Sequence, residues 1–440
     1  MSNLEIGIWS FPVLLVLIFL RVPIGLAMMG VGVGGTYLVM GSTLMTMGQL
    51  KHLTFSTFSS YSLSIVPLFL LMGQFATHSG MSKGLFKAAE AWLGHLKGGV
   101  AMSAIGACAG FGAICGSSLA TAATMGQVAL PELRRYGYSG PLATGTLAAG
   151  GTLGILIPPS VILVIYAILT EQNIAKLFVA AFAPGILAAV GYMLVVAIYV
   201  RVVPGSGDAL ERVPMAERFR ALIAVWPVIV IFGAVVGGIY TGIFTPTEAA
   251  AVGAMGTGIV ALASGGLNMP KLVQSVLSTA NSTAMIFFIV LGAGMFNSFL
   301  ALTQLPQTSA QWVADQGFSP MFVLFCVLVL YLVFGCVMDS LSMVLLTVPI
   351  FFPIMIALDF GMSVEDFALW FGIIVLIVVE VGLITPPVGM NLFVINAMAR
   401  DIPISETFRG TAPFVLADII RVVILVAFPP ITLALVWWIY

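Results

Sequence analysis

The chain has 440 residues, of which 60% are hydrophobic and only 8% are charged, whereas a soluble globular protein carries about 25% charged residues. Its 16 Lys plus Arg and 17 Asp plus Glu give a formal net charge of −1, with no basic stripe that could bind a nucleic-acid backbone. Composition and charge therefore exclude a water-soluble fold and a nucleic-acid-binding protein.

Long apolar runs are distributed along the whole chain. Three of them, residues 322–338, 367–379 and 422–440, approach or reach the ~20 residues that a helix needs to cross a bilayer. An outer-membrane barrel would instead alternate apolar and polar residues in segments of about ten. The first apolar segment lacks the charged start and the cleavage site of a signal peptide, so we expect it to be retained. The sequence predicts an all-α polytopic membrane protein.

Two stretches of the chain repeat one pattern. In the first, the polar run GSS at 116–118 interrupts an apolar segment, and the element GILIPP follows at 154–159. In the second, DS at 339–340 interrupts an apolar segment, and GLITPP follows at 382–387. Interrupted hydrophobic segments at corresponding positions of two halves indicate the binding site of a secondary transporter.

Charge predicts how the two repeats are oriented. Lys and Arg flank the first interruption on both sides, whereas the stretch between Lys271 and Arg400, which contains the second, has none. Because cytoplasmic loops are enriched in Lys and Arg, the first hairpin should enter from the cytoplasm and the second from outside. We predict one membrane transporter unit (1–440) that contains a first repeat of hairpin and broken helix (98–203), a cytoplasmic linker (204–220) and a second, inverted repeat (319–400).

The interruptions predict unwound backbone at membrane depth. Unwound chain is tolerated there only where it is buried in protein or lines a cavity. Proline frees carbonyl groups of the helix, and these carbonyls with Ser or Thr hydroxyls suit Na⁺, while exposed N-termini of half-helices attract anions. The pattern favours Na⁺-driven transport of an anion, and a pair of ordinary helix kinks is the simpler alternative.

Two carboxylates accompany these elements. Asp339 lies deep in an apolar run, where a charge costs roughly 2.5–3.5 kcal/mol, so we predict a functional role for it. Its simpler role would be a salt bridge or a helix cap. Glu380 precedes the second Pro-Pro element, and we interpret it as an acceptor behind the ion site, a proton site or a packing residue at a hydrated interface.

Five motifs in order resemble the large membrane subunit of the tripartite ATP-independent periplasmic (TRAP) transporters, the DctM type, over nearly the whole chain. They are GSSLAT at 116–121, GTLGILIPPS at 151–160, GIFTPTE at 242–248, MD at 338–339 and GLITPPVGMN at 382–391. The resemblance implies an inverted-repeat, elevator-type secondary transporter with two re-entrant helical hairpins, broken helices and two Na⁺ sites.

Site residues are carried over from the family motifs. The first Na⁺ site would use, largely through backbone carbonyls, Cys115, Ser117, Gly154, Ile157 and Pro159. By repeat symmetry, the second would use Gly335, Asp339, Gly382, Thr385 and Pro387. The hairpin tips and the substrate site would use Ser118, Thr121, Ser340 and Asn391, with Glu380 behind the second ion site. A carbonyl ligand at position 115 would survive the presence of cysteine where the family has serine.

The resemblance also implies partners, coupling ion and location. A small four-helix membrane subunit would complete the scaffold, and a periplasmic solute-binding protein would deliver an organic acid such as a C4-dicarboxylate or sialic acid. Na⁺ would be the coupling ion, with no other cofactor, and the protein would lie in the bilayer of the bacterial inner membrane. At this length the chain has no room for the small subunit, so we expect a separate polypeptide.

Two other classes of protein stay open. A self-sufficient Na⁺- or H⁺-coupled anion carrier of the same broad superfamily would need no binding protein, and Asp339 or Glu380 would carry the proton. An intramembrane enzyme is the remote alternative, because the sequence offers neither a His at membrane depth to pair with Ser117 nor clustered Asp residues. We expect no enzymatic activity.

Overall fold

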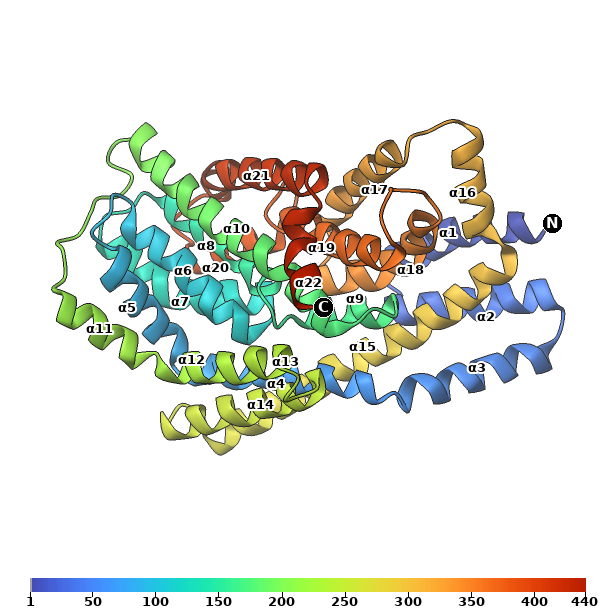
Figure 1. Cartoon of the computed structure of the whole chain (residues 1–440), viewed down its shortest axis with the longest axis horizontal. Helices are drawn as coiled ribbons and strands as arrows, with labels where there is room; N and C mark the ends of the chain where they lie inside the picture. The colour runs from blue at the N-terminus through green and yellow to red at the C-terminus, as the bar shows by residue number, and fades with distance from the viewer. Residues whose placement is uncertain (1) are drawn as a thin grey trace.

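The computed structural model describes residues 2–440, apart from the side chains at positions 310 and 314, and its regular structure there consists only of helices (Figure 1). The helices that precede the first hairpin are α1 (Asn3–Phe19), α2 (Ile24–Met40), α3 (Thr43–Phe58), the 3-10 turn η1 (Tyr61–Ser64), α4 (Ile65–His78) and α5 (Met81–Leu93). The first repeat contains α6 (Gly99–Cys115), α7 (Ser118–Arg135), α8 (Gly140–Leu156), α9 (Val161–Leu169) and α10 (Ile174–Val202).

The second half of the chain is built in a similar way. Between the repeats lie α11 (Met215–Ala224), α12 (Trp226–Phe232), the π-helical turn η2 (Gly233–Gly237), α13 (Gly238–Tyr240), α14 (Pro246–Ala263), α15 (Met269–Thr303) and α16 (Leu305–Asp315). The second repeat and the C-terminus contain α17 (Pro320–Gly335), α18 (Ser340–Ile356), α19 (Val364–Gly382), α20 (Met390–Met398), α21 (Ile404–Ala427) and α22 (Pro430–Ile439).

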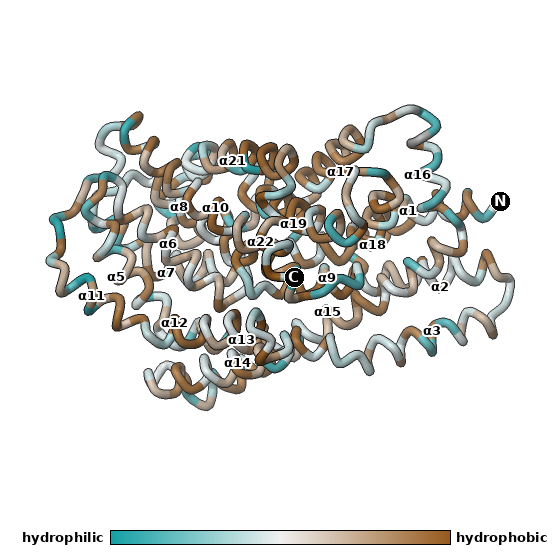
Figure 2. The backbone as a smooth tube through the Cα atoms, viewed as in Figure 1, coloured by the Kyte–Doolittle hydropathy of each residue, from teal (hydrophilic) through white to brown (hydrophobic). Residues whose placement is uncertain are grey.

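Several of these helices are suited to a bilayer. Four helices, α10, α14, α15 and α21, are long and apolar enough to cross a membrane. Three bent pairs, α3 with η1–α4, α8 with α9 and α11 with α12–α13, raise that number to seven if each pair forms one span. Hydrophobic residues are spread along most of the helices, and hydrophilic ones gather around α11 and α16 and in the loops toward the two ends of the molecule (Figure 2). The prediction of an all-α polytopic membrane protein is confirmed.

Each predicted interruption is a break between two helices of a hairpin. Helix α6 ends at Gly116, whose φ of +64° is a left-handed conformation that glycine adopts without a steric penalty. Ser117 then caps α7 by accepting a hydrogen bond from the backbone N–H of Ala120. In the second hairpin, Asp339 caps α18 in the same way and accepts from the N–H of Ser342 at 3.0 Å. The two caps explain why polar residues interrupt the apolar runs at these points.

The two hairpins, α6–α7 and α17–α18, lie toward opposite ends of the long axis of the molecule (Figure 1). Each packs beside a broken helix of its own repeat: α8–α9 is bent by 46°, and α19–α20 is interrupted at residues 383–389. The second piece of each broken helix also packs against the other repeat's hairpin, α9 against α18 and α20 against α7. The four elements therefore interlock around one centre.

Glycine allows each hairpin to cross its broken helix at backbone distance. A Cβ placed on Gly112 of α6 would lie 2.4 Å from the Cα of Gly154 in α8. A Cβ placed on Gly382 of α19 would lie 2.5 Å from the carbonyl carbon of Gly335 in α17. Neither crossing has room for a side chain, so the glycines of the GxxxPP elements are required by close packing.

A second hydrophobic core lies outside this centre. Helices α1, α2 and α15 form it with Leu14, Met28, Phe296 and Phe299, together with residues of α18. Helix α2 approaches α15 through glycine, since a Cβ on Gly32 would come within 2.8 Å of the backbone of Met295.

The predicted linker (204–220) contains the start of a helix. Residues 204–214 lack helical structure, and Met215 begins α11 within the predicted range. The irregular part is fixed to neighbouring loops, because the N–H of Leu210 donates to the carbonyl of Gly94 and the N–H of Ser139 donates to the carbonyl of Ser206. Amphipathic packing of α11 on α5 explains why the polar composition did not prevent a helix.

Replacing Gly112 with alanine should destabilise the protein, because the new methyl group would overlap the backbone of Gly154. Overpacking of this kind costs about 1–3 kcal/mol or more, and it should lower the apparent melting temperature of the purified protein in detergent. Gly191→Ala is the matched control, since nothing lies within 4 Å of a Cβ at that helical position. An equal melting temperature for Gly112→Ala and Gly191→Ala would contradict the proposed crossing.

Candidate functional site

The carboxylate of Glu380 joins the tips of the two hairpins. Its Oε2 accepts a hydrogen bond from Ser118 Oγ at 2.5 Å, and its Oε1 accepts one from Ser340 Oγ at 2.6 Å. Glu380 lies in α19 and is only 1% exposed. The Glu380 side chain therefore connects α19 with the N-termini of α7 and α18, which are distant in the sequence.

The position of the two serines explains how a buried carboxylate is accommodated. Ser118 is the first residue of α7, and Ser340 is the first residue of α18. The N-terminus of a helix carries a partial positive charge, so two such termini meet at Glu380. Two hydroxyl donors and two helix dipoles replace the water that the carboxylate loses on burial.

The residues predicted for the first ion site meet at the crossing of α6–α7 with α8–α9. A Cβ on Gly154 would lie 2.8 Å from the carbonyl oxygen of Ser117, and a Cβ on Gly116 would lie 3.3 Å from the carbonyl oxygen of Pro159. The carbonyl oxygen of Cys115 lies against Gly73 of α4, and the side chain of Ile157, which was predicted to act through its carbonyl, lies against Gly185 of α10. The structure thus brings Ser117 close to Gly154, and Pro159 close to the turn at Gly116.

The residues predicted for the second ion site also lie around one break. Gly335 and Gly382 are in backbone contact, and the N–H of Gly389 donates to the carbonyl of Cys336 at 3.1 Å. The Thr385 hydroxyl donates to the carbonyl of Val381 at 2.6 Å, which leaves its oxygen lone pairs free to accept or ligate. Pro387 is exposed, whereas Pro159 of the first repeat is buried, so the second break is the more open of the two.

Asp339 caps α18 at the second break. A helix cap is one of the simpler roles that the sequence allowed for it. Its Oδ2 accepts the hydrogen bond from Ser342, and the residue is only partly buried. A carboxylate has two oxygens with about four lone-pair sites, so capping leaves acceptor capacity for a cation.

Thr121 lies beside Gly154 within the first repeat, and Asn391 links the second repeat to the first. Thr121 Oγ1 would be 2.5 Å from a Cβ on Gly154, and Asn391 Nδ2 donates to the carbonyl of Ala148 in α8. Within the described part of the chain, Thr121 Oγ1 and Asn391 Oδ1 are buried and have no hydrogen-bond partner. Unpaired buried oxygens of this kind are costly unless a ligand or water completes them.

A buried polar network that the sequence analysis missed lies behind these residues. The hydroxyl of Tyr192 donates to Asp418 Oδ2 at 2.7 Å and is 3.0 Å from the hydroxyl of Thr152, while Arg421 and Asp418 form a buried ion pair at 2.9 Å. Thr152 precedes Gly154 by two residues, as Glu380 precedes Gly382. The two repeats therefore place a polar side chain at the same point before each break.

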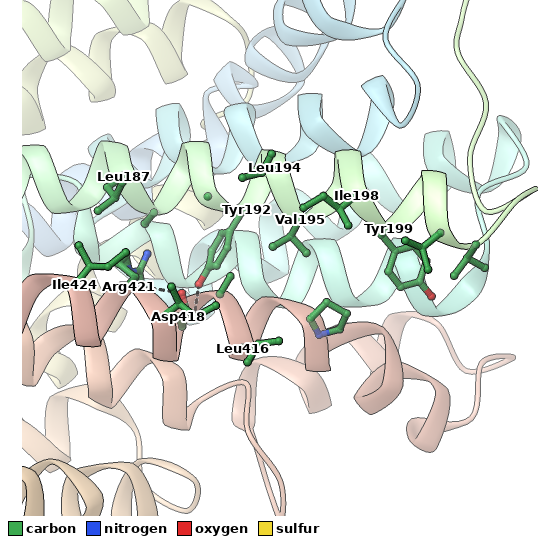
Figure 3. A pocket seen from close by; sticks show the side chains of 17 residues that line it. Leu187, Tyr192, Leu194, Val195, Ile198, Tyr199, Leu416, Asp418, Arg421 and Ile424 are labelled. Carbon is green, nitrogen blue, oxygen red and sulfur yellow. Dashed lines mark hydrogen bonds and ion pairs between the residues drawn. The ribbon is translucent and has the colours of Figure 1, made fainter.

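The network opens onto an apolar groove of about 630 Å³ between α10 and α21. Figure 3 shows Tyr192, Asp418 and Arg421 together at one end of this groove, among aliphatic side chains that include Leu187, Leu194 and Ile198. Asp418 and Arg421 lie three residues apart within the apolar segment after residue 413. This charged pair was the sequence signal that could have revealed the network.

Membrane-length helices, paired hairpins and helices broken at a shared polar centre define a polytopic membrane protein of the secondary-transporter class. A family model described as "Tripartite ATP-independent periplasmic transporter, DctM component" matches residues 11–431. The chain belongs to this DctM family of TRAP transporter large permeases.

Individual relatives agree with this assignment. The chain is 38% identical over 386 residues to the C4-dicarboxylate TRAP transporter large permease protein DctM of Pseudomonas aeruginosa, covering 87% of this chain and 88% of that protein. It is 31% identical to the sialic acid TRAP transporter large permease protein SiaM of Vibrio cholerae, over 86% of each chain. The crystal structure of the Alcanivorax borkumensis YdaH transporter has a similar fold, with a TM-score of 0.61, 15% identity, and coverage of 87% of this chain and 90% of that one.

Removing the Glu380 carboxylate should disrupt the joined hairpin tips. Glu380→Ala leaves Ser118 and Ser340 without their acceptor, and each lost charge-assisted hydrogen bond is worth about 1.5–3 kcal/mol. We expect transport by the reconstituted complex to fall roughly 10-fold or more. Glu380→Gln should retain more activity than Glu380→Ala, because an amide oxygen still accepts from one serine.

Glu211→Gln serves as the control for this series, because Glu211 is exposed in the linker. Uptake should be compared at equal amounts of folded protein in the vesicles. Wild-type uptake by Glu380→Ala would contradict a role for the carboxylate at the tips.

Breaking the buried ion pair should cost more than removing it. Arg421→Met leaves Asp418 buried with Tyr192 as its remaining polar partner, and such single changes typically destabilise by about 3–5 kcal/mol. The double variant Asp418→Leu with Arg421→Met leaves no unpaired charge and should melt at a higher temperature than either single variant. Additive losses in a double-mutant cycle, measured as apparent melting temperatures, would show that the pair is not coupled.

Proposed function

We propose that this chain is the large membrane subunit of a Na⁺-coupled TRAP transporter that imports a small organic acid delivered by a periplasmic solute-binding protein. The observation that carries the proposal is the meeting of two helix N-termini and two helix breaks at Glu380, inside a helical membrane protein. A purely structural subunit has no need of such paired interruptions, whereas a transporter uses them to hold an ion and an anion near the middle of the bilayer.

The chemistry of the two breaks favours Na⁺ as the coupling ion. The backbone oxygens of Ser117, near Gly154, and of Pro159, near Gly116, would hold one ion, and Asp339 with the oxygens of Thr385 would hold the other. Hard oxygen donors from unwound backbone and hydroxyl groups suit an alkali-metal cation. A thiol is a poor ligand for Na⁺, and the carbonyl oxygen of Cys115 lies against Gly73 of α4, so this set does without Cys115.

The substrate would be bound beside these breaks. Thr121 Oγ1 and Asn391 Oδ1 are unpaired buried groups on α7 and α20, which adjoin the breaks, and the N-termini of α9 and α20 add positive electrostatic potential. Relatives are named for C4-dicarboxylate, sialic acid, ectoine and isethionate. A C4-dicarboxylate is the first substrate to test, given the 38% identity to the Pseudomonas aeruginosa protein.

An elevator movement fits the division of the helices. Glu380 fastens both hairpins to α19, so the two repeats would move together as a unit. The separate core of α1, α2 and α15 would form part of the static scaffold. A small membrane subunit would complete that scaffold: one relative is a fused permease protein, DctMQ, of which this chain covers 59%. The complex would operate in the bacterial inner membrane, where a periplasmic binding protein can reach it.

A H⁺-coupled carrier that needs no binding protein is the second candidate. The observation that favours it is the burial of the Glu380 carboxylate in an apolar helix, since buried carboxylates in membrane helices are frequent proton sites.

Uptake into proteoliposomes distinguishes the Na⁺-coupled TRAP transporter from the self-sufficient H⁺-coupled carrier. Vesicles would contain this chain and the small subunit, with the binding protein and labelled succinate outside, and Na⁺ would be exchanged for choline. We expect uptake only when Na⁺ and the binding protein are both present. Equal uptake in choline, with a dependence on the pH gradient, would contradict Na⁺ coupling, and uptake without the binding protein would favour the self-sufficient carrier.

Two substitutions at Asp339 distinguish ion binding from helix capping. Asparagine caps a helix as well as aspartate does, but it carries no charge. We therefore expect Asp339→Asn to raise the Na⁺ concentration for half-maximal uptake several-fold while leaving thermal stability unchanged. Asp339→Ala should also lower the melting temperature. Unchanged Na⁺ dependence in Asp339→Asn would reduce the role of this residue to that of a cap.

A further inference from the structure

The two breaks are held by different partners. In the second repeat, Glu380 lies two residues before Gly382 and joins the hairpin tips. In the first repeat, Thr152 takes the equivalent place before Gly154, and its hydroxyl lies 3.0 Å from the hydroxyl of Tyr192 in α10. The first break is therefore linked to a helix outside the hairpins.

The last turn of α8, which leads into the first break, is held from two sides. A Cβ on Gly151 would lie 2.7 Å from the Cβ of Ala122, and a Cβ on Gly154 would lie 2.8 Å from the carbonyl oxygen of Ser117. Residues three apart share one face of a helix, so both glycines face the hairpin α6–α7. Thr152 is rotated about 100° from Gly151, and it faces α10 instead.

This turn ends in carbonyl groups that the helix cannot satisfy. Pro158 and Pro159 have no N–H, so the carbonyls of Gly154 and Ile155, four residues earlier, receive no hydrogen bond from the helix. Carbonyls at a broken helix are the type of ligand that we propose for the first ion site. Their direction follows the rotation of the last turn, which the contact at Thr152 fixes.

The side chain of Tyr192 is itself held firmly by α21. It is 1% exposed, and its ring packs edge-to-face on Phe414 with the centroids 5.6 Å apart. The guanidinium carbon of Arg421 lies 5.7 Å from the ring centroid, and the hydroxyl donates to Asp418 Oδ2 at 2.7 Å. Because ring and hydroxyl both have partners on α21, Tyr192 presents its oxygen to Thr152 in one position.

The hydroxyl protons determine the direction of these hydrogen bonds. The single hydroxyl proton of Tyr192 goes to Asp418, so Tyr192 meets Thr152 as an acceptor. The hydroxyl of Thr152 has a second acceptor within reach, the carbonyl of Ala149 at 2.7 Å, but the helix already provides that carbonyl with a donor. The bonds from Thr152 to Tyr192 and from Tyr192 to Asp418 then run in one direction, which strengthens both.

We propose that Tyr192 is a positioning residue for the first ion site. By holding Thr152, it fixes the rotation of the last turn of α8 and hence the direction of the carbonyls of Gly154 and Ile155. The buried pair of Asp418 and Arg421 holds Tyr192 and contacts neither ion nor substrate. This inference rests on the proposed function, which supplies the ion.

A general structural role is the alternative, because the network also links α8, α10 and α21, which pack against one another. Loss of a structural link lowers the amount of folded protein and the maximal uptake. Loss of a positioning contact instead weakens the affinity for Na⁺. The two roles therefore differ in whether the Na⁺ concentration for half-maximal uptake changes.

Tyr192→Phe keeps the ring and removes only the hydroxyl. We expect the Na⁺ concentration for half-maximal uptake to rise roughly 3- to 10-fold, as the loss of one hydrogen bond predicts, with maximal uptake near wild type at equal amounts of folded protein. Tyr199→Phe is the matched control, because it makes the same change two turns further along α10 on the same groove (Figure 3). It should leave the Na⁺ dependence unchanged. An unchanged Na⁺ dependence in Tyr192→Phe, whatever its maximal uptake, would overturn the proposal.

Substitutions at Thr152 test the same contact from α8. Thr152→Val removes the hydroxyl at nearly constant volume and should raise the half-maximal Na⁺ concentration as Tyr192→Phe does. Thr152→Ser retains the hydroxyl and should stay near wild type. The double variant of Thr152→Val with Tyr192→Phe should show no larger change than either single variant, since each removes the same hydrogen bond. Multiplied effects in the double variant, or equal changes for valine and serine, would overturn the proposal.

Na⁺ binding to the purified chain distinguishes this inference from the proposed function. A bound ion stabilises the folded state, so melting temperatures measured while Na⁺ replaces choline report binding without substrate or partner proteins. We expect Na⁺ to stabilise the wild-type chain, and Tyr192→Phe to need a higher Na⁺ concentration for half of the effect. Half-maximal stabilisation of both chains at the same concentration would overturn this inference and leave the proposed function intact. Stabilisation of neither chain would overturn both.

Discussion

The two hydrogen bonds that Glu380 accepts are the interaction on which the arrangement of the repeats depends. A carboxylate inside an apolar helix is stable only where donors replace its water, and the donors here are Ser118 and Ser340, one from each hairpin. The carboxylate and the two serines depend on each other. The carboxylate needs both serines, and the serines at two helix N-termini acquire a common acceptor that sets the distance between the tips. Two hairpins far apart in sequence therefore meet at one point.

The bilayer explains why the rest of the structure is organised around this point. Broken helices expose backbone groups that lipid cannot satisfy, so the breaks must be enclosed by protein. Glycine at the crossings, Gly112 on Gly154 and Gly335 on Gly382, allows the neighbouring backbone to cover each break. The network of Thr152, Tyr192 and Asp418 extends the polar centre toward α10 and α21. Packing and polar satisfaction support the same site, which ties the fold to the function we propose for it.

Local features of the site were predictable from sequence, and its long-range contacts were not. Ser117 and Asp339 follow the capping rules, so the hairpin breaks could be placed from their residues alone. The partner of Glu380 could not, because 262 residues separate it from Ser118 and no local pattern encodes that contact. The start of α11 within the predicted linker was not expected, because the polar residues there form an amphipathic helix. The orientation of single groups, such as the carbonyl of Cys115 and the side chain of Ile157, depends on tertiary packing that sequence does not specify.

The central claim is that substrate and Na⁺ cross the membrane together through this chain. The most direct test is the simultaneous measurement of radiolabelled Na⁺ and labelled succinate entering the same proteoliposomes, with the small subunit and the binding protein present. The account predicts that succinate stimulates Na⁺ entry in a fixed ratio, with the two proposed sites giving two Na⁺ for each substrate. Succinate uptake without any accompanying Na⁺ entry would contradict the account and transfer the coupling role to protons at Glu380.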